Sequence, residues 1–350
     1  MNNKRSEPLI PVTVLTGFLG SGKTTILSRI LRQPIFTNTA VIVNEFGEVG
    51  LDHLLVESSD ENIVDLSCGC ICCTIRGDLM ATLIDLYDRR EAGEIGRFER
   101  VVVETTGLAD PAPIIQTMMQ EPLVFKHYRL ARIVTAVDAV NAMTTFDRQP
   151  EAIKQAAVAD ALLVTKTDMA NEKLALTALD TRLRQLNPSA VRARCVDGAV
   201  DPETLFNGGI YDPAGKTAEV EGWLAVESVA DGHHHEKDIN RHGDGISTYA
   251  LTRDVPVSRA TLGAFTQMLA DQRGDDLLRL KGFVWLNDDP TSPAVVHGVH
   301  RAIHTIRRLD AWPDGVDRTL IVFIVRGIEQ DWVENLFDRV VESAYADLSV

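Results

Sequence analysis

Residues 10–25 read Ile-Pro-Val-Thr-Val-Leu-Thr-Gly-Phe-Leu-Gly-Ser-Gly-Lys-Thr-Thr, and this stretch decides the fold. An apolar, β-branched run enters a glycine-rich turn, and a segment with helical spacing of apolar residues, 24–31, leaves it. The pattern Gly17-x-x-x-x-Gly22-Lys23-Thr24 is that of a P-loop in its required context, with a strand before it and a helix after it. The stretch therefore predicts a site for the phosphates of a nucleoside triphosphate.

Each part of the loop has a physical task. The glycines let the backbone curl so that successive N–H groups point at phosphate oxygens, and the helix N-terminus adds a partial positive charge. Lys23 can reach the β- and γ-phosphates, and the Thr24 hydroxyl can ligate Mg²⁺. The predicted phosphate-binding residues are Gly20, Ser21, Gly22, Lys23, Thr24 and Thr25.

The composition sets limits on partners and location. In 350 residues, 35 Lys and Arg face 50 Asp and Glu, for a net charge of −15, and no basic run is present. This argues against nucleic acid and anionic membranes as partners. No apolar stretch is long enough to span a bilayer, and the apolar run near the N-terminus feeds the P-loop rather than a signal peptide. We expect a cytoplasmic protein.

Four of the five cysteines gather at positions 68, 70, 72 and 73, whereas Cys195 stands alone. Disulfides between such close neighbours are strained, so the cluster favours metal binding or redox work, with buried structural thiols as the alternative. The thiolates of Cys70, Cys72 and Cys73 can converge on one borderline cation. Because no second cysteine pair follows, we expect an open site completed by an acid or a histidine from elsewhere.

Two further segments predict nucleotide contacts. The apolar run 101–103 ends in Glu104, which is typical of a Walker B strand with its acid near Mg²⁺, and Gly107 lies where a backbone N–H could contact the γ-phosphate. Another apolar strand, 161–165, ends in Thr165-Lys166-Thr167-Asp168. An aspartate there can accept the two N–H donors of the guanine edge while the lysine stem lies along the base. Lys23, Thr24 and Glu104 are the predicted catalytic residues.

The repeated strand–helix order predicts an α/β fold, a mostly parallel sheet with helices on both faces, over residues 1–206. Residues 207–246 hold glycines, prolines and His233-His234-His235, and predict a linker, with weak metal collection as the alternative to a solvated loop. Residues 247–350 predict a small α+β domain of four strands and two helices. We interpret its His297, His300 and His304 as ordinary residues. The stretch from Asp138 to Pro150 is expected to be irregular.

Taken together, the sequence resembles the CobW-type branch of the P-loop GTPases (the CobW/HypB/UreG family). The segments that carry the resemblance are Gly17–Thr25, Asn44-Glu-Phe-Gly47, Gly69-Cys-Ile-Cys-Cys73, Glu104–Pro111 and Thr165–Asp168. It covers nearly the whole chain, including a CobW C-terminal domain. It implies a metallochaperone that hydrolyses GTP to GDP and handles zinc, cobalt or iron for a client metalloprotein.

By position, the resemblance implies metal binding at Cys70, Cys72 and Cys73, with Glu48 as an acidic partner. Cys68 lies outside that motif. The guanine motif of the family begins with Asn, and here it begins with Thr165, which keeps a hydroxyl and loses the amide. Asp168, the main discriminator of guanine, is retained. The family's partner is a client protein, and a homodimer is left open.

No glutamine follows Gly107, where some GTPases keep a residue that orients water, so we expect slow intrinsic hydrolysis. The cysteines lie in sequence between the segments expected to respond to the γ-phosphate, so nucleotide state and metal affinity can be linked. Two rival functions remain at this point. One is a P-loop kinase or ATPase acting on a small molecule, and the other is a binding module that holds metal and nucleotide statically.

Overall fold

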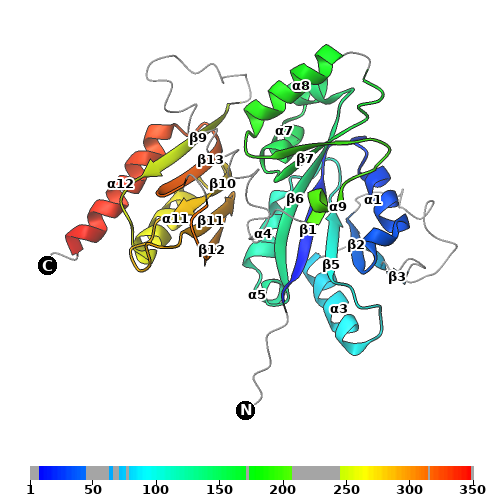
Figure 1. The fold of residues 1–350 in the computed structure, drawn as a ribbon, viewed down its shortest axis with the longest axis horizontal. Helices are drawn as coiled ribbons and strands as arrows, with labels where there is room; N and C mark the ends of the chain where they lie inside the picture. The colour runs from blue at the N-terminus through cyan, green and yellow to red at the C-terminus, as the bar shows by residue number, and fades with distance from the viewer. Residues whose placement is uncertain are drawn as a thin grey trace. The chain divides into compact units, whose positions relative to one another are not determined.

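The structure is a computed structural model, and it describes residues 8–44, 63–65, 71–75, 79–170, 173–206, 245–313 and 316–347. It contains two sheets, one of eight strands and one of five (Figure 1). The strands of the larger sheet are β1 (Ile10–Thr16), β2 (Thr39–Asn44), β3 (Ile63–Asp65), β4 (Ile71–Ile75), β5 (Arg100–Glu104), β6 (Tyr128–Asp138), β7 (Ala161–Thr165) and β8 (Val191–Cys195). Their helices are α1 (Lys23–Arg32), the 3-10 helix η1 (Pro34–Phe36), α3 (Leu79–Ala92), α4 (Ala112–Gln120), α5 (Pro122–Phe125), α6 (Ala142–Arg148), α7 (Pro150–Ala157), α8 (Lys173–Leu186) and α9 (Pro202–Phe206).

Strand β1 lies near the middle of the larger sheet, whose order is β3-β4-β2-β5-β1-β6-β7-β8 (Figure 1). The pairs from β4 to β7 are all parallel, and β3 runs antiparallel to β4. The chain leaves β1 toward β2 and leaves β6 toward β7, in opposite directions along the sheet. Ligands of open α/β sheets bind at such a reversal, beyond the carboxyl ends of the strands.

The register brings the strand ends together. Leu15 of β1 is paired with Glu104 of β5, and Asp138 of β6 with Thr165 of β7. The apolar residues of β1 and β5 are almost wholly buried, as expected for a parallel sheet covered on both faces. The predicted α/β fold with a second α+β domain is confirmed.

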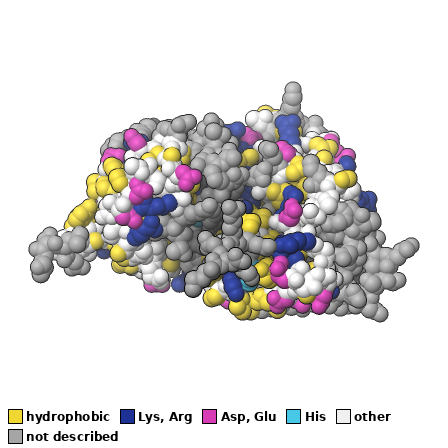
Figure 2. All heavy atoms as spheres, turned by 60° about the horizontal axis from the view of Figure 1, so that its bottom comes forward, with side chains coloured by type: hydrophobic (Ala, Val, Ile, Leu, Met, Phe, Trp, Pro, Cys, Tyr) yellow, Lys and Arg dark blue, Asp and Glu magenta, His cyan; other side chains and the backbone are white. Residues whose placement is uncertain are grey.

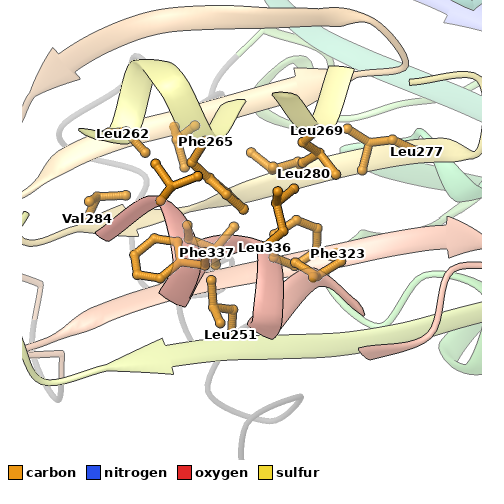
Figure 3. Packing of buried hydrophobic residues seen from close by; sticks show 14 of the residues in the cluster. Leu251, Leu262, Phe265, Leu269, Leu277, Leu280, Val284, Phe323, Leu336 and Phe337 are labelled. Atoms are coloured by element: carbon orange, nitrogen blue, oxygen red, sulfur yellow. The ribbon is translucent and has the colours of Figure 1, made fainter. Parts of the chain in front are cut away.

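The smaller sheet is antiparallel, with the order β12-β11-β10-β13-β9. Its elements are β9 (Ile246–Arg253), α11 (Arg259–Arg273), β10 (Leu277–Val284), β11 (Ala294–Val299), β12 (Ala302–Arg308), β13 (Thr319–Arg326) and α12 (Gln330–Asp347). Side chains of α11 and α12, among them Phe265 and Phe337, pack on one another and on Leu280 and Phe323 of the sheet (Figure 3). This apolar layer is the core of the C-terminal part of the chain.

The chain divides into two compact units: Met1–Val140 with Ala161–Met169 and Arg192–Asn207, and Asn141–Asp160 with Ala170–Val191 and Gly208–Val350. The second unit thus includes α6, α7 and α8 along with the smaller sheet. The predicted domain limits at 206 and 247 stay predictions. On the face drawn in Figure 2, Lys and Arg side chains lie among Asp and Glu side chains. No helix in the described part of the chain is long and apolar enough to cross a bilayer.

A buried ionic cluster lies inside the second unit. Asp160 forms ion pairs with Arg279 and Lys281 of β10, and all three side chains are at most 4% exposed. Burial alone would raise the pKa of Asp160, but the charges of Arg279 and Lys281 hold that pKa well below its usual value. Arg279 also donates to the carbonyl of Val158. The cluster therefore fixes residues 158–160, which lead directly into β7.

Two local expectations were wrong. The stretch after Asp138 contains helix α6, because Ala142 and Phe146, one turn apart, are both buried. The C-terminal sheet has a fifth strand, β12, which pairs with β11 and places His304 opposite His297. His297, His300 and His304 have the i, i+3, i+7 spacing of a helix face, but here they lie on β11, on the turn and on β12. The chain reverses at His300, whose φ is +51°.

Candidate nucleotide-binding site

The P-loop joins β1 to α1, as its sequence predicts. Gly17 has a φ of +139°, and a Cβ atom there would lie 2.4 Å from the carbonyl oxygen of Ala136. Gly22, the N-cap of α1, has a φ of +93°. Only glycine adopts these conformations at little cost, so the loop can curl against β6. No acidic residue stands in the first turn of α1 to oppose a bound phosphate.

Lys23 is turned back into this loop. Its side chain is buried, and Nζ donates to the carbonyl oxygens of Gly17 at 2.7 Å and Phe18 at 3.3 Å. Thr24 and Thr25, next in α1, are exposed at the helix N-terminus. The ammonium and the first helical N–H groups thus meet at one place, which is the arrangement that binds phosphate. The individual phosphate and Mg²⁺ contacts stay predictions.

The end of β5 lies against the P-loop. Glu104 is 9% exposed, and the next residue, Thr105, donates from Oγ1 to Thr16 Oγ1 at 2.7 Å. A Cβ atom at Gly107 would lie 2.7 Å from the backbone nitrogen of Leu19. The structure therefore brings the predicted Glu104 and Gly107 beside the phosphate loop. The oxygen donors of Thr24 and Glu104 are those that Mg²⁺ prefers.

The base motif at the end of β7 also touches the P-loop. The Thr165 hydroxyl, 4% exposed, donates to the carbonyl oxygens of Ser21 at 2.7 Å and Val137 at 3.2 Å. A Cβ atom at Gly22 would lie 3.6 Å from the Thr165 side chain. Thr165 thus attaches the motif to the P-loop. Local sequence carries no signal for this contact, because it forms only where the end of β7 meets the P-loop.

The remaining residues of the motif face outward to different degrees. Asp168 is exposed and makes no hydrogen bond or ion pair with any residue the structure describes. Lys166 is partly buried, and its Nζ lies 2.9 Å from Asp138 Oδ2 at the end of β6. Asp138 is not among the site residues predicted from the sequence, because it follows a strand as many aspartates do. An available carboxylate beside a fixed lysine is suited to reading the edge of a base.

The predicted metal ligands fall only partly within the described residues. Cys72 and Cys73 occupy successive positions of β4, where they pair with Val41 and Ile42 of β2. Glu48, Cys68 and Cys70 lie outside the described residues, as does the histidine-bearing stretch of the linker. The described part of the chain contains no group of three or more potential metal ligands. Cys195 is fully buried, and burial raises the pKa of its thiol.

The fold and this edge of the sheet define a P-loop nucleotide-binding protein. The chain belongs to the CobW/HypB/UreG family: residues 11–193 match its nucleotide-binding domain, and residues 246–341 match the cobalamin synthesis protein CobW C-terminal domain.

Individual relatives cover almost the whole chain. It is 35% identical to the zinc chaperone YjiA of Escherichia coli, over 90% of this chain and 93% of YjiA. It is 27% identical to the zinc chaperone CobW of Pseudomonas aeruginosa, over 93% and 90% of the two chains. The crystal structure of zinc-bound YjiA GTPase from E. coli superposes with a TM-score of 0.74 and 31% identity, over 95% of this chain and 99% of YjiA.

A second solved structure is the zinc-bound form of a triple mutant of YjiA GTPase, in which one glutamate and two neighbouring cysteines are replaced by alanine. It aligns with a TM-score of 0.73 and 32% identity, over 95% of this chain and 99% of the mutant.

Proposed function

We propose that this chain is a slow GTPase that binds zinc at Cys70-x-Cys72-Cys73 with Glu48 and delivers it to a client metalloprotein, its zinc affinity set by the bound nucleotide. One observation carries the proposal. Strand β4, which holds Cys72 and Cys73, is hydrogen-bonded to β2, and β2 is hydrogen-bonded to β5, which ends in Glu104. Cys72, Cys73 and the carboxyl end of β5 therefore belong to one continuous stretch of sheet, so a change at either end of it can alter the other.

Guanine is the base that the motif at 165–168 suits. The exposed Asp168 carboxylate can accept from both N–H donors of the guanine edge, whereas adenine presents a different pattern. The GTPases among the relatives support the same choice. Replacing Asp168 by Asn is expected to move base preference from guanine toward xanthine. A kinase or ATPase acting on a small molecule would prefer ATP and would be insensitive to that change.

Hydrolysis at this site relies on positioning and charge. Lys23 and the N–H groups of the P-loop hold the β- and γ-phosphates, and Thr24 and Glu104 supply the oxygens that would hold Mg²⁺. The metal ion, when bound, neutralises charge on the phosphates. The residue after Gly107 is Leu108, which is exposed and cannot orient a water molecule as glutamine does. Slow intrinsic turnover follows from this sequence.

Zinc is the favoured cargo because thiolates suit it and the named relatives are zinc chaperones. Cobalt and iron remain alternatives, since affinity alone does not select a metal in a cell. The YjiA triple mutant, which lacks one glutamate and two neighbouring cysteines, is itself zinc-bound, so we do not take total bound zinc as the readout. The test must therefore follow one site and its dependence on nucleotide.

The experiment is a chelator competition for zinc, run on protein loaded with a non-hydrolysable GTP analogue and on protein loaded with GDP. The variant Cys72→Ser is compared with Cys195→Ala, which removes the lone buried thiol of β8 instead. We expect a nucleotide-dependent shift in zinc affinity that Cys72→Ser abolishes and Cys195→Ala preserves. Equal affinities in the two nucleotide states would reject the chaperone mechanism in favour of a static binding module.

A further inference from the structure

Lys166 is held by a residue that belongs to none of the nucleotide motifs. Its Nζ lies 2.9 Å from Oδ2 of Asp138, the last residue of β6, and the two side chains are 33% and 11% exposed. The other carboxylate oxygen, Oδ1, accepts from the backbone nitrogen of Val140 at 2.8 Å. One oxygen therefore fixes the carboxylate to its own loop, and the other fixes the lysine.

The backbone around the pair is arranged to make this contact. Asp138 and Thr165 are register partners, and the nitrogen of Ala139 donates to the carbonyl oxygen of Thr165 at 3.0 Å. Lys166 has a φ of +55°, a left-handed conformation that lysine rarely adopts. Its carbonyl accepts from Met169 at 3.1 Å, which helps to hold the turn. Strained backbone at a residue of a ligand motif points to a use in binding.

We propose that Asp138 is a positioning residue of the base site: it anchors the Lys166 ammonium so that the lysine stem is held along the face of the guanine. This inference rests on the proposed function, since it presupposes guanine at this motif. A free lysine stem has many rotamers, and a ligand that packs on it must restrict them at a cost in affinity. Anchoring Nζ in advance removes much of that cost.

Two acidic residues of the base site, Asp138 and Asp168, have separate tasks. Asp168 reads the guanine edge, so its contribution depends on the groups that the base carries there. The Lys166 stem lies on the flat face, which guanine and hypoxanthine share. Loss of Asp138 should therefore weaken GDP and IDP to the same degree and leave their ratio unchanged, because hypoxanthine lacks only the exocyclic amino group at the edge.

The test measures the dissociation constants of fluorescent mant-GDP and mant-IDP for the wild type, Asp138→Asn, Lys166→Met and the double variant. We expect Asp138→Asn to weaken both nucleotides about fivefold, the size expected when a partly exposed ion pair no longer orders its partner. We also expect the double variant to bind no more weakly than Lys166→Met, because Asp138 acts only through Lys166.

A matched control is Asp275→Asn, which makes the same substitution in a carboxylate paired with Arg301 of the turn between β11 and β12 and should leave both dissociation constants unchanged. Asp138→Asn should also unfold at nearly the wild-type temperature, because partly exposed ion pairs contribute little to stability. A change within about twofold for both nucleotides, or losses that add in the double variant, would overturn the role of Asp138. A wild type that prefers ADP to GDP, or an Asp168→Asn variant with unchanged base preference, would instead reject the proposed function.

Discussion

Two carboxylates lie near opposite ends of strand β7, and their surroundings give them different tasks: Asp160 precedes the strand in the chain, and Asp138 ends the neighbouring strand β6. Asp160, just before the strand, is buried with Arg279 and Lys281 in the second unit. Asp138, paired in register with the end of the strand, holds a lysine that water still reaches. Removing one partner of a fully buried ion pair leaves an unmatched buried charge and costs much stability. Removing one partner of a partly exposed pair costs little, because water solvates the remaining charge. The comparison separates residues that build the fold from residues that tune a ligand site.

The largest expected effect concerns Asp160. Asp160→Ala leaves Arg279 and Lys281 buried without their carboxylate and should lower the free energy of unfolding by about 3–5 kcal/mol. The measurement is urea unfolding followed by tryptophan fluorescence, since Trp285, Trp312 and Trp332 all lie in the second unit. Asp275→Ala, which breaks the exposed pair with Arg301, should leave the midpoint unchanged. Equal midpoints for Asp160→Ala and the wild type would mean that the buried carboxylate of Asp160 does not stabilise the fold.

The carboxylate of Asp160 also makes the stability of the fold depend on pH. Because the pKa of Asp160 is lowered in the folded protein, its contribution to stability is complete above the unfolded-state pKa of about 4 and is lost progressively as pH falls from there through the lower folded pKa. Between about pH 5 and pH 3 the wild type should therefore lose more stability than Asp160→Asn, because the asparagine side chain does not take up a proton in this range. Urea midpoints at several pH values test this. Equal losses of stability in both proteins would mean that other carboxyl groups control unfolding at low pH.

At the nucleotide edge, the largest effect is expected from Lys23. Its buried ammonium already lies among the P-loop carbonyls, so Lys23→Ala removes the charge nearest the phosphates and should weaken GTP about 100-fold or more. Calorimetric titration with GTP and Mg²⁺ measures the loss, and Lys154→Ala on α7 is the control. Unfolding stability should change little in comparison, in contrast to Asp160→Ala. Retained affinity would place the phosphates elsewhere.

A smaller loss of affinity is expected from Gly107→Ala, and this loss should differ between GTP and GDP. An alanine Cβ there would lie 2.7 Å from the Leu19 nitrogen, so one of the two loops must shift. Gly107→Ala should weaken the GTP analogue about tenfold and GDP less, because only the former has a γ-phosphate for this turn to contact. Gly263→Ala in α11, where the added carbon meets no atom within 4 Å, is the control. Equal losses for both nucleotides would argue against contact with the γ-phosphate.

The smallest predicted effect is at Thr165. Thr165→Val removes the hydroxyl that bonds the carbonyls of Ser21 and Val137, and should weaken GDP about fivefold, whereas Thr165→Ser should bind as the wild type does. Fluorescence titration with mant-GDP resolves a change of that size. If Val and Ser behaved alike, the contact would be packing by the methyl group, and the motif would not depend on the hydrogen bond to the P-loop.

Local sequence determined much of the fold. The P-loop glycines, the apolar strands ending in Glu104 and Thr165, and the repeated strand–helix order predicted the parallel sheet and its ligand edge, because backbone freedom and apolar periodicity are local properties. Short elements escaped prediction. Helix α6 is stabilised by burial of Phe146, and β12 is an edge strand. The spacing of His297, His300 and His304, which spans β11, the turn and β12, is the same as that of residues on one face of a helix. Helix α6 and strand β12 both depend on what packs against them.

The sequence by itself thus determined the class of fold, the phosphate loop and the residues proposed to read the base. Only the tertiary structure decided which polar residues are partners: Thr165 with Ser21, Asp138 with Lys166, and Asp160 with Arg279 and Lys281. Asp160 and Lys281 are 121 residues apart, and no spacing rule connects them. Such pairs form because strand register and sheet order bring distant residues together, and burial then determines whether their charges support the fold or remain available to a ligand.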